Sequence, residues 1–149
     1  MGTWYRCQCE CGYYKELYVG FGMHYESGNN EINHQMRNEA FGQEYAKILK
    51  ETQYGFADTT QAIYQCTQCG DFESMETLDI CQQNEELEKM HFCIYAENKT
   101  KMVREYVHRC KKCNGVMKKI LHDEEVPSVD VKCPSCNQNT EIIEVGVWD

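Results

Sequence analysis

Cysteine is the residue type in this sequence with the most chemical potential, since 11 cysteines occur in 149 residues. Four of them form two Cys-x₂-Cys motifs, Cys110–Cys113 and Cys133–Cys136, which are separated by 19 residues. A Cys-x₂-Cys turn brings two thiolates onto one ion, and two such turns complete the tetrahedron that Zn²⁺ accepts. The spacing therefore predicts a closed, structural zinc site, which we call the C-terminal quartet.

The residues after these motifs agree with that prediction. Asn114 and Asn137 each follow a motif, and asparagine tolerates the left-handed backbone that such a turn requires. The same four sulfurs could hold iron in a rubredoxin-like centre, which stays open as an alternative. Disulfides are disfavoured because the sequence starts without an apolar secretory segment, so we expect the protein in the reducing cytoplasm.

A second quartet is expected in the N-terminal half. Cys66 and Cys69 form a third Cys-x₂-Cys motif, which a glycine follows. Cys11 also precedes a glycine, so it is predicted as a ligand, and Cys9 is predicted as the fourth. The pair Cys9-x-Cys11 is one residue shorter than the usual turn, which leaves Cys7 open as an alternative ligand. This N-terminal quartet is predicted to hold a second zinc ion.

Cys81 and Cys93 remain outside both quartets. A free cysteine is often buried as a small apolar residue, and we predict that role for Cys93 in its apolar run. The alternative is a zinc-linked thiol switch, in which oxidation of a spare thiol displaces a ligand and releases the ion.

Motifs of catalysis are missing from the sequence. The five histidines form no His-x₃-His or His-Glu-x-x-His pattern, so a catalytic zinc with an open position has no visible ligands. The sequence has no nucleophile elbow, Walker loop or dinucleotide fingerprint. We therefore expect that the protein is not an enzyme.

Charge bears on the choice of partner. The formal net charge is −9, and an acidic chain gains little from the release of phosphate counterions, which disfavours nucleic acid. We expect a protein partner and no membrane association. Residues 101–122 are the exception, with seven basic residues against one acidic residue. A nucleic-acid-binding zinc ribbon that uses this basic face is the alternative function, with these predicted contacts: Arg104, Arg109, Lys111, Lys112, Lys118 and Lys119.

The elements that position the cysteines follow from hydrophobic periodicity. Apolar residues recur at helical spacing over about 31–51, which predicts one helix weakened or broken at Gly42, with its apolar stripe in a core. Elsewhere the period is two, and Phe72–Ile80 is predicted as a strand. The polar segment 82–90 is a predicted boundary. We expect an α+β, metal-stapled fold of two antiparallel β modules: 1–82, with the helical insert, and 91–149.

The two quartets and their surroundings resemble the zinc-ribbon class, and in particular small bacterial proteins that carry two such ribbons. The resemblance depends on Cys-x-Cys-Gly-Tyr at 9–13, Gly-Phe-Gly-Met-His-Tyr at 20–25, Phe-Gly-Gln-Glu at 41–44 and Tyr-x-Cys-x₂-Cys-Gly at 64–70. It implies the fold and two zinc ions per chain, but no activity, because those proteins have no assigned function. The sequence departs from a plain ribbon at Cys7 and Cys81.

These observations predict a zinc-binding, non-catalytic interaction or adaptor protein with two structural Cys₄ sites. Their ligands are the two quartets, with Cys7 as the alternative: Cys9, Cys11, Cys66 and Cys69 in the N-terminal quartet, and Cys110, Cys113, Cys133 and Cys136 in the C-terminal quartet.

Overall fold

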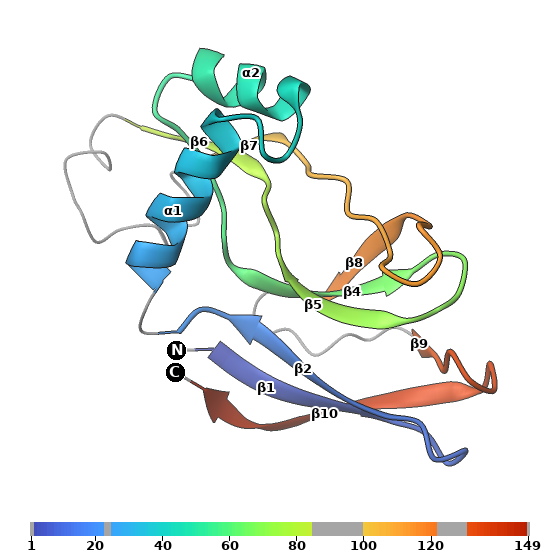
Figure 1. Cartoon of the computed structure of the whole chain (residues 1–149). Helices are drawn as coiled ribbons and strands as arrows, with labels where there is room; N and C mark the ends of the chain where they lie inside the picture. The colour runs from blue at the N-terminus through green and yellow to red at the C-terminus, as the bar shows by residue number, and fades with distance from the viewer. Residues whose placement is uncertain (1, 23–24, 85–99, 122–130, 149) are drawn as a thin grey trace. The chain divides into compact units, whose positions relative to one another are not determined.

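The structure is a computed structural model that describes residues 2–22, 25–84, 100–121 and 131–148 (Figure 1). These residues form antiparallel sheets and two helices, so the described chain is mostly β. The chain divides into two compact units, each made of separate segments. Unit 1 comprises Met1–Met23, Thr60–Glu76 and Val107–Asp149, and unit 2 comprises His24–Thr59 and Thr77–Tyr106.

Unit 1 is a seven-stranded antiparallel sheet in the order β5-β4-β2-β1-β10-β9, with β8 also paired to β4. Its strands have the following bounds: β1 Gly2–Gln8, β2 Tyr14–Gly20, β4 Gln61–Cys66, β5 Phe72–Glu76, β8 Met117–Leu121, β9 Val131–Lys132 and β10 Asn139–Trp148. The pairing of β2 with β4 is limited to Gly20 and Gln61. The sheet therefore consists of two groups, β2-β1-β10-β9 and β5-β4-β8, and one ladder pair joins them among the described residues.

The two groups of strands share one hydrophobic core. Tyr5 and Leu17, from β1 and β2, are fully buried together with Ile63 and Phe72, from β4 and β5. Alternate residues of β1 point inward, which matches the period of two expected for a strand with one buried face. Further bonds join the groups, since the Tyr18 amide donates to Ser74 Oγ at 2.6 Å. The shared core thus joins the two groups of strands into one unit.

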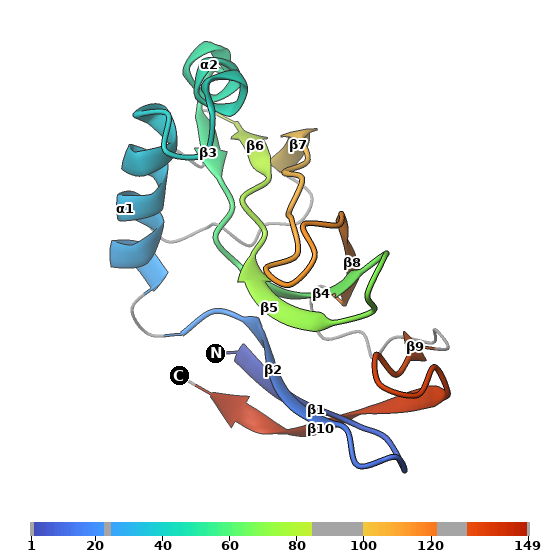
Figure 2. The same cartoon turned by 45° about the vertical axis from the view of Figure 1, so that its right-hand side comes forward.

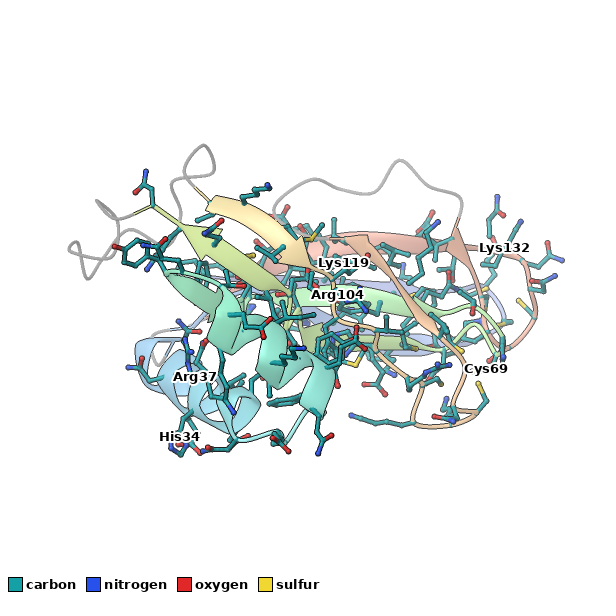
Figure 3. The ribbon with its side chains drawn as sticks, turned by 90° about the horizontal axis from the view of Figure 1, so that it is seen from above. His34, Arg37, Cys69, Arg104, Lys119 and Lys132 are labelled. Atoms are coloured by element: carbon teal, nitrogen blue, oxygen red, sulfur yellow. The ribbon has the colours of Figure 1, made fainter. Side chains whose placement is uncertain are left out.

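Unit 2 contains both helices and a three-stranded sheet in the order β3-β6-β7 (Figure 2). Its elements are α1 Tyr25–Arg37, α2 Gln43–Glu51, β3 Gly55–Ala57, β6 Ile80–Gln83 and β7 Thr100–Arg104. Met36 and Leu49 are fully buried with Ile80, which confirms that the predicted apolar stripe lies in a core. Arg37, labelled in Figure 3, ties α1 to β3 by donating to the Gly55 carbonyl at 2.9 Å.

The predicted helical region 31–51 is broken, and the break includes Gly42, where the sequence predicted it. The chain forms two helices, and residues 38–42 between them turn. Glu39 and Gly42 have φ values of 69° and 105°, in the left-handed region that an α-helix does not accommodate. The helical period continues across the break because both helices bury apolar residues in the same core.

The units also differ from the predicted modules 1–82 and 91–149. Each predicted module mixes segments of both units, because the chain alternates between the units along its length. The predicted strand Phe72–Ile80 is divided between β5 in unit 1 and β6 in unit 2. It breaks near Leu78, whose φ is 57°. Most of the predicted boundary 82–90 lies outside the described residues.

Candidate metal centres

The eight predicted ligand cysteines lie in two clusters of four within unit 1. We call them site A and site B, and the sulfur atoms within each lie within 4.8 Å of one another. Site A is formed by Cys9, Cys11, Cys133 and Cys136. Site B is formed by Cys66, Cys69, Cys110 and Cys113. Figure 3 labels Cys69, which lies in the turn between β4 and β5.

The spacing of the sulfurs fits a tetrahedral metal ion and excludes disulfides. In site A the distances Cys9 Sγ–Cys136 Sγ and Cys11 Sγ–Cys133 Sγ are 3.5 and 3.6 Å. In site B two comparable distances are 3.4 and 3.6 Å. A disulfide bond is about 2.05 Å long. Four sulfurs each about 2.3 Å from a central Zn²⁺ are about 3.8 Å apart. Each cluster could therefore hold an ion such as zinc.

The grouping of the cysteines differs from the predicted quartets. Cys133 and Cys136 join Cys9 and Cys11, whereas the predicted partners in the C-terminal quartet lie in site B. The cause is strand pairing. β10, which follows Cys136, pairs with β1 along its length, and β8, which follows Cys113, pairs with β4. Each site therefore joins two turns from distant parts of the chain.

The three Cys-x₂-Cys turns share one backbone pattern. In each turn the first cysteine donates its amide N–H to the carbonyl five residues later, and its own carbonyl accepts the N–H four residues later. The residue after the second cysteine has a positive φ: 73° at Gly70, 60° at Asn114 and 60° at Asn137. This confirms the predicted left-handed role of both asparagines.

The Cys9–Cys11 turn follows the same plan with one residue fewer. The Cys9 amide donates to the Tyr13 carbonyl, four residues later, at 3.0 Å, and Gly12 donates to the Cys9 carbonyl at 2.9 Å. Gly12 has a φ of 91°, so a left-handed residue again follows the second cysteine. Shortening both hydrogen-bonded rings by one residue lets a Cys-x-Cys pair supply two sulfurs to one site.

Backbone amides favour the thiolate form of two ligands. Burial acts to raise the pKa of Cys66, but N–H donation from Cys69 and Gln68 outweighs it and lowers that pKa to about 6. Burial likewise opposes the shift at Cys133, where donation that includes the Ser135 N–H lowers the pKa to about 7. The 3.4 Å contacts from Gln68 N and Ser135 N to these sulfurs are the structural basis.

The second cysteine of the same turns is shifted in the opposite direction. The Asp71 N–H favours the Cys69 thiolate, but burial and the neighbouring sulfurs prevail and raise its pKa to about 12. Cys136, which receives the Gln138 N–H, is raised to about 12 for the same reasons. Four thiolates this close repel one another, so full ionisation requires a cation between them. The donor set therefore fits a divalent ion that thiolates prefer.

The remaining cysteines are not part of either site. Cys7 was the alternative ligand, but it is fully buried in the core of unit 1 and lies outside site A. Burial raises the pKa of Cys7 to about 11, so it is protonated at neutral pH. Cys81 lies half-buried on β6 of unit 2. Cys93 lies outside the described residues.

The predicted nucleic-acid contacts are divided between the two units. Arg104 belongs to unit 2, where it pairs with Glu44, whereas the other five belong to unit 1. Lys111 and Lys112 pair with the carboxylates of Glu73 and Asp71 at 4.0 and 3.0 Å. The other three are distributed as follows: Arg109 and Lys118 exposed, and Lys119 half-buried with its Nζ 6.0 Å from the Tyr64 ring centre.

Asp71 is a residue of the site region that sequence reasoning missed. Its carboxylate is 3% exposed and also lies 3.6 Å from Lys15 Nζ and 3.5 Å from the Tyr13 hydroxyl. An aspartate after a Cys-x₂-Cys-Gly motif is typical of a solvated turn, and nothing in its spacing signals burial. Its partners are distant in the sequence and become neighbours only through the sheet.

Comparison of the chain with protein-family models, with curated proteins and with solved structures finds no match. The metal assignment therefore depends on the sulfur geometry, and the resemblance to two-ribbon bacterial proteins stays a prediction. The helices among the described residues are too short and too polar to cross a membrane.

Proposed function

We propose that this chain is a zinc-binding, non-catalytic protein whose two structural Cys₄ sites hold a β scaffold used to bind another protein. The observation that carries the proposal is the pair of clusters, in each of which four cysteine sulfurs lie within 4.8 Å of one another. Four thiolates fill the coordination sphere of Zn²⁺ and leave no position for water or substrate. Such a site supports structure and offers no open position for catalysis.

The outer face of β2, β1 and β10 supports a protein partner. Tyr14 and Tyr18 on β2 are 54% and 37% exposed, and Ile143 on β10 is 40% exposed. Strand register places them on one face, because Tyr18 pairs with Trp4 and Ile143 pairs with Arg6, two positions apart on β1. Exposed aromatic residues together with arginine are typical of protein interfaces. With a net charge of −9, the expected partner surface is apolar with a basic rim.

The first test is the metal itself. Elemental analysis of the purified chain is expected to give two zinc ions per chain, and a strong chelator is expected to abolish the folded β signal in circular dichroism. Iron in place of zinc would change the assigned metal. A metal-free protein with an intact β spectrum would contradict the proposal.

The second test concerns the partner. A Tyr14→Ser, Ile143→Ser double variant is expected to keep two metal ions and lose a protein that co-purifies with the native chain. Met102→Ser is the matched control, because Met102 is 58% exposed on β7, which belongs to the three-stranded sheet of unit 2. Retention of the partner by the double variant would contradict the assignment of this face.

Nucleic-acid binding is distinguished by a mobility-shift titration with mixed RNA and DNA. No shift is expected even at low salt, where phosphate contacts are strongest. A shift that Arg109→Ala or Lys118→Ala weakens would favour the basic residues as the functional surface instead.

A further inference from the structure

We propose that sites A and B bind metal cooperatively, so that an ion in either site raises the affinity of the other. The inference rests on the proposed metal-binding function and concerns three direct contacts between the turns that carry the ligands. All of these contacts lie within unit 1.

The first contact is between the backbones of two turns. Gly70 ends the Cys66–Cys69 turn of site B, and Pro134 lies inside the Cys133–Cys136 turn of site A. A Cβ placed on Gly70 would lie 3.4 Å from the Cα of Pro134. Main chain therefore packs on main chain here, and a shift of either turn displaces the other.

The second contact is a side-chain clamp. Gln65 directly precedes Cys66, and its Nε2 donates to two carbonyls at once. One is the Gly70 carbonyl in site B, at 3.1 Å, and the other is the Lys132 carbonyl, next to Cys133 of site A, at 2.9 Å. Both amide protons of this glutamine are thus used to join the two ligand-bearing turns.

The third contact is the buried carboxylate of Asp71. It accepts from Lys112, which lies inside the Cys110–Cys113 turn, at 3.0 Å, and the Tyr13 hydroxyl lies 3.5 Å away. Tyr13 closes the short turn of site A by accepting the Cys9 amide. Asp71 also closes a site B turn, since its carbonyl accepts the Cys66 amide at 2.8 Å. One residue is therefore bonded to turns of both sites.

Through these contacts, an ion bound in one site raises the affinity of the other site. An ion in site A orders the turns at 9–13 and 132–136, which then hold Gly70 and Asp71 beside the ligands of site B. Site B consequently loses less conformational entropy when it binds its own ion. Coupling of this kind is reciprocal, and couplings between protein sites are typically about fivefold or larger.

The experiment compares the whole chain with chains that keep one site. Zinc affinities are measured by competition with a chelator of known affinity for the native chain, for Cys136→Ser, which lacks site A, and for Cys113→Ser, which lacks site B. The product of the two native binding constants is expected to exceed the product of the two single-site constants by about fivefold or more. Equal products would overturn the coupling and leave the proposed function standing, whereas no zinc binding by the native chain would overturn both.

A second variant keeps all eight thiols, so the test does not depend on the folding of the serine variants. Gln65→Ala is expected to raise the one-zinc species in native mass spectra during chelator titration of the whole chain. Gln61→Ala is the matched control, because Gln61 is also a glutamine of β4 but lies at the opposite end of that strand from Cys66. It is expected to behave like the native chain. A one-zinc population that Gln65→Ala does not change would overturn the proposal.

Discussion

Site A and site B each use four cysteines, but the turns that carry these cysteines differ between the two sites. Site B combines two full Cys-x₂-Cys turns, and its cross-turn sulfur pairs are 41 and 47 residues apart in the sequence. Site A combines one full turn with the short Cys9–Cys11 turn, and its pairs are 122 and 127 residues apart. Closing the longer loop costs about 0.9 kcal/mol more in chain entropy. The comparison teaches that each turn sets the local geometry of its two sulfurs, whereas the pairing of strands in the sheet sets which two turns form a site.

The largest expected effect is the removal of both ions. Structural zinc contributes about 10–16 kcal/mol of apparent binding free energy in small domains, so metal-free unit 1 is expected to unfold. Site A should release its ion first, because its Cys9–Cys11 turn is one residue short and only one of its four cysteines is buried, against two in site B. Amide NMR signals around Cys11 should therefore change before those around Cys66 as chelator is added. The reverse order would break the comparison.

A smaller effect separates the true ligands of site A from their neighbour. Cys133→Ala should reduce the metal content from two ions to one, because three sulfurs do not fill the tetrahedron. Cys7→Ala should keep two ions and lower the free energy of unfolding by about 1 kcal/mol, since it leaves a small cavity in the core. Metal analysis and urea unfolding of both variants provide the measurement. Loss of an ion in Cys7→Ala would reopen the choice between Cys7 and Cys9.

Alanine substitutions at Gly12 in site A and Gly70 in site B test how the backbone of each turn tolerates a side chain. Alanine at Gly12, φ 91°, has open space around its Cβ, so only the left-handed strain of about 1–2 kcal/mol is expected. Alanine at Gly70, φ 73°, carries similar strain, and its Cβ would lie 3.4 Å from Pro134 Cα, in ordinary van der Waals contact. Gly70→Ala and Gly12→Ala should therefore lower the midpoint of thermal unfolding by similar amounts. A much larger loss in Gly70→Ala would show that the packing of Gly70 on Pro134 tolerates no added atom.

The smallest effect concerns two adjacent lysines in a site B turn. Lys112→Met removes a 3.0 Å partner from the buried Asp71 and should cost about 1 kcal/mol, with Lys15 still present to limit the loss. Lys111 is 75% exposed and lies 4.0 Å from Glu73, so Lys111→Met should cost less than about 0.5 kcal/mol. Urea unfolding of the two variants checks the order. A larger effect at Lys111 would contradict a role for Asp71 in joining the turns.

The ligands could be recognised from the sequence because their signal is local. A Cys-x₂-Cys motif followed by Gly70, Asn114 or Asn137 specifies a turn within six residues, and the turn hydrogen bonds and positive φ values agree. The buried stripe through Met36 and Leu49 was readable for the same reason, since its period depends on one short segment.

The pairing of the turns could not be read in this way. The nineteen residues between Cys113 and Cys133 are a spacing that suits one site. In the structure, however, the strands that follow these two turns have different partners: β8 pairs with β4, and β10 pairs with β1. Strand register between distant segments leaves no mark at fixed spacing, because many alternations of period two match one another. The break between the helices was expected at Gly42, but apolar periodicity does not reveal that the backbone already turns at Glu39.

The ligands of site B are nested between the two halves of site A in the sequence, and this order has a consequence for synthesis on the ribosome. All four thiols of site B have been translated once Cys113 has been added, whereas Cys9 and Cys11 must wait for Cys133 and Cys136. The nascent chain therefore carries the sulfurs of Cys9 and Cys11 through the translation of more than a hundred further residues before their partners exist. During synthesis the ligands of the inner centre are available before those of the outer one.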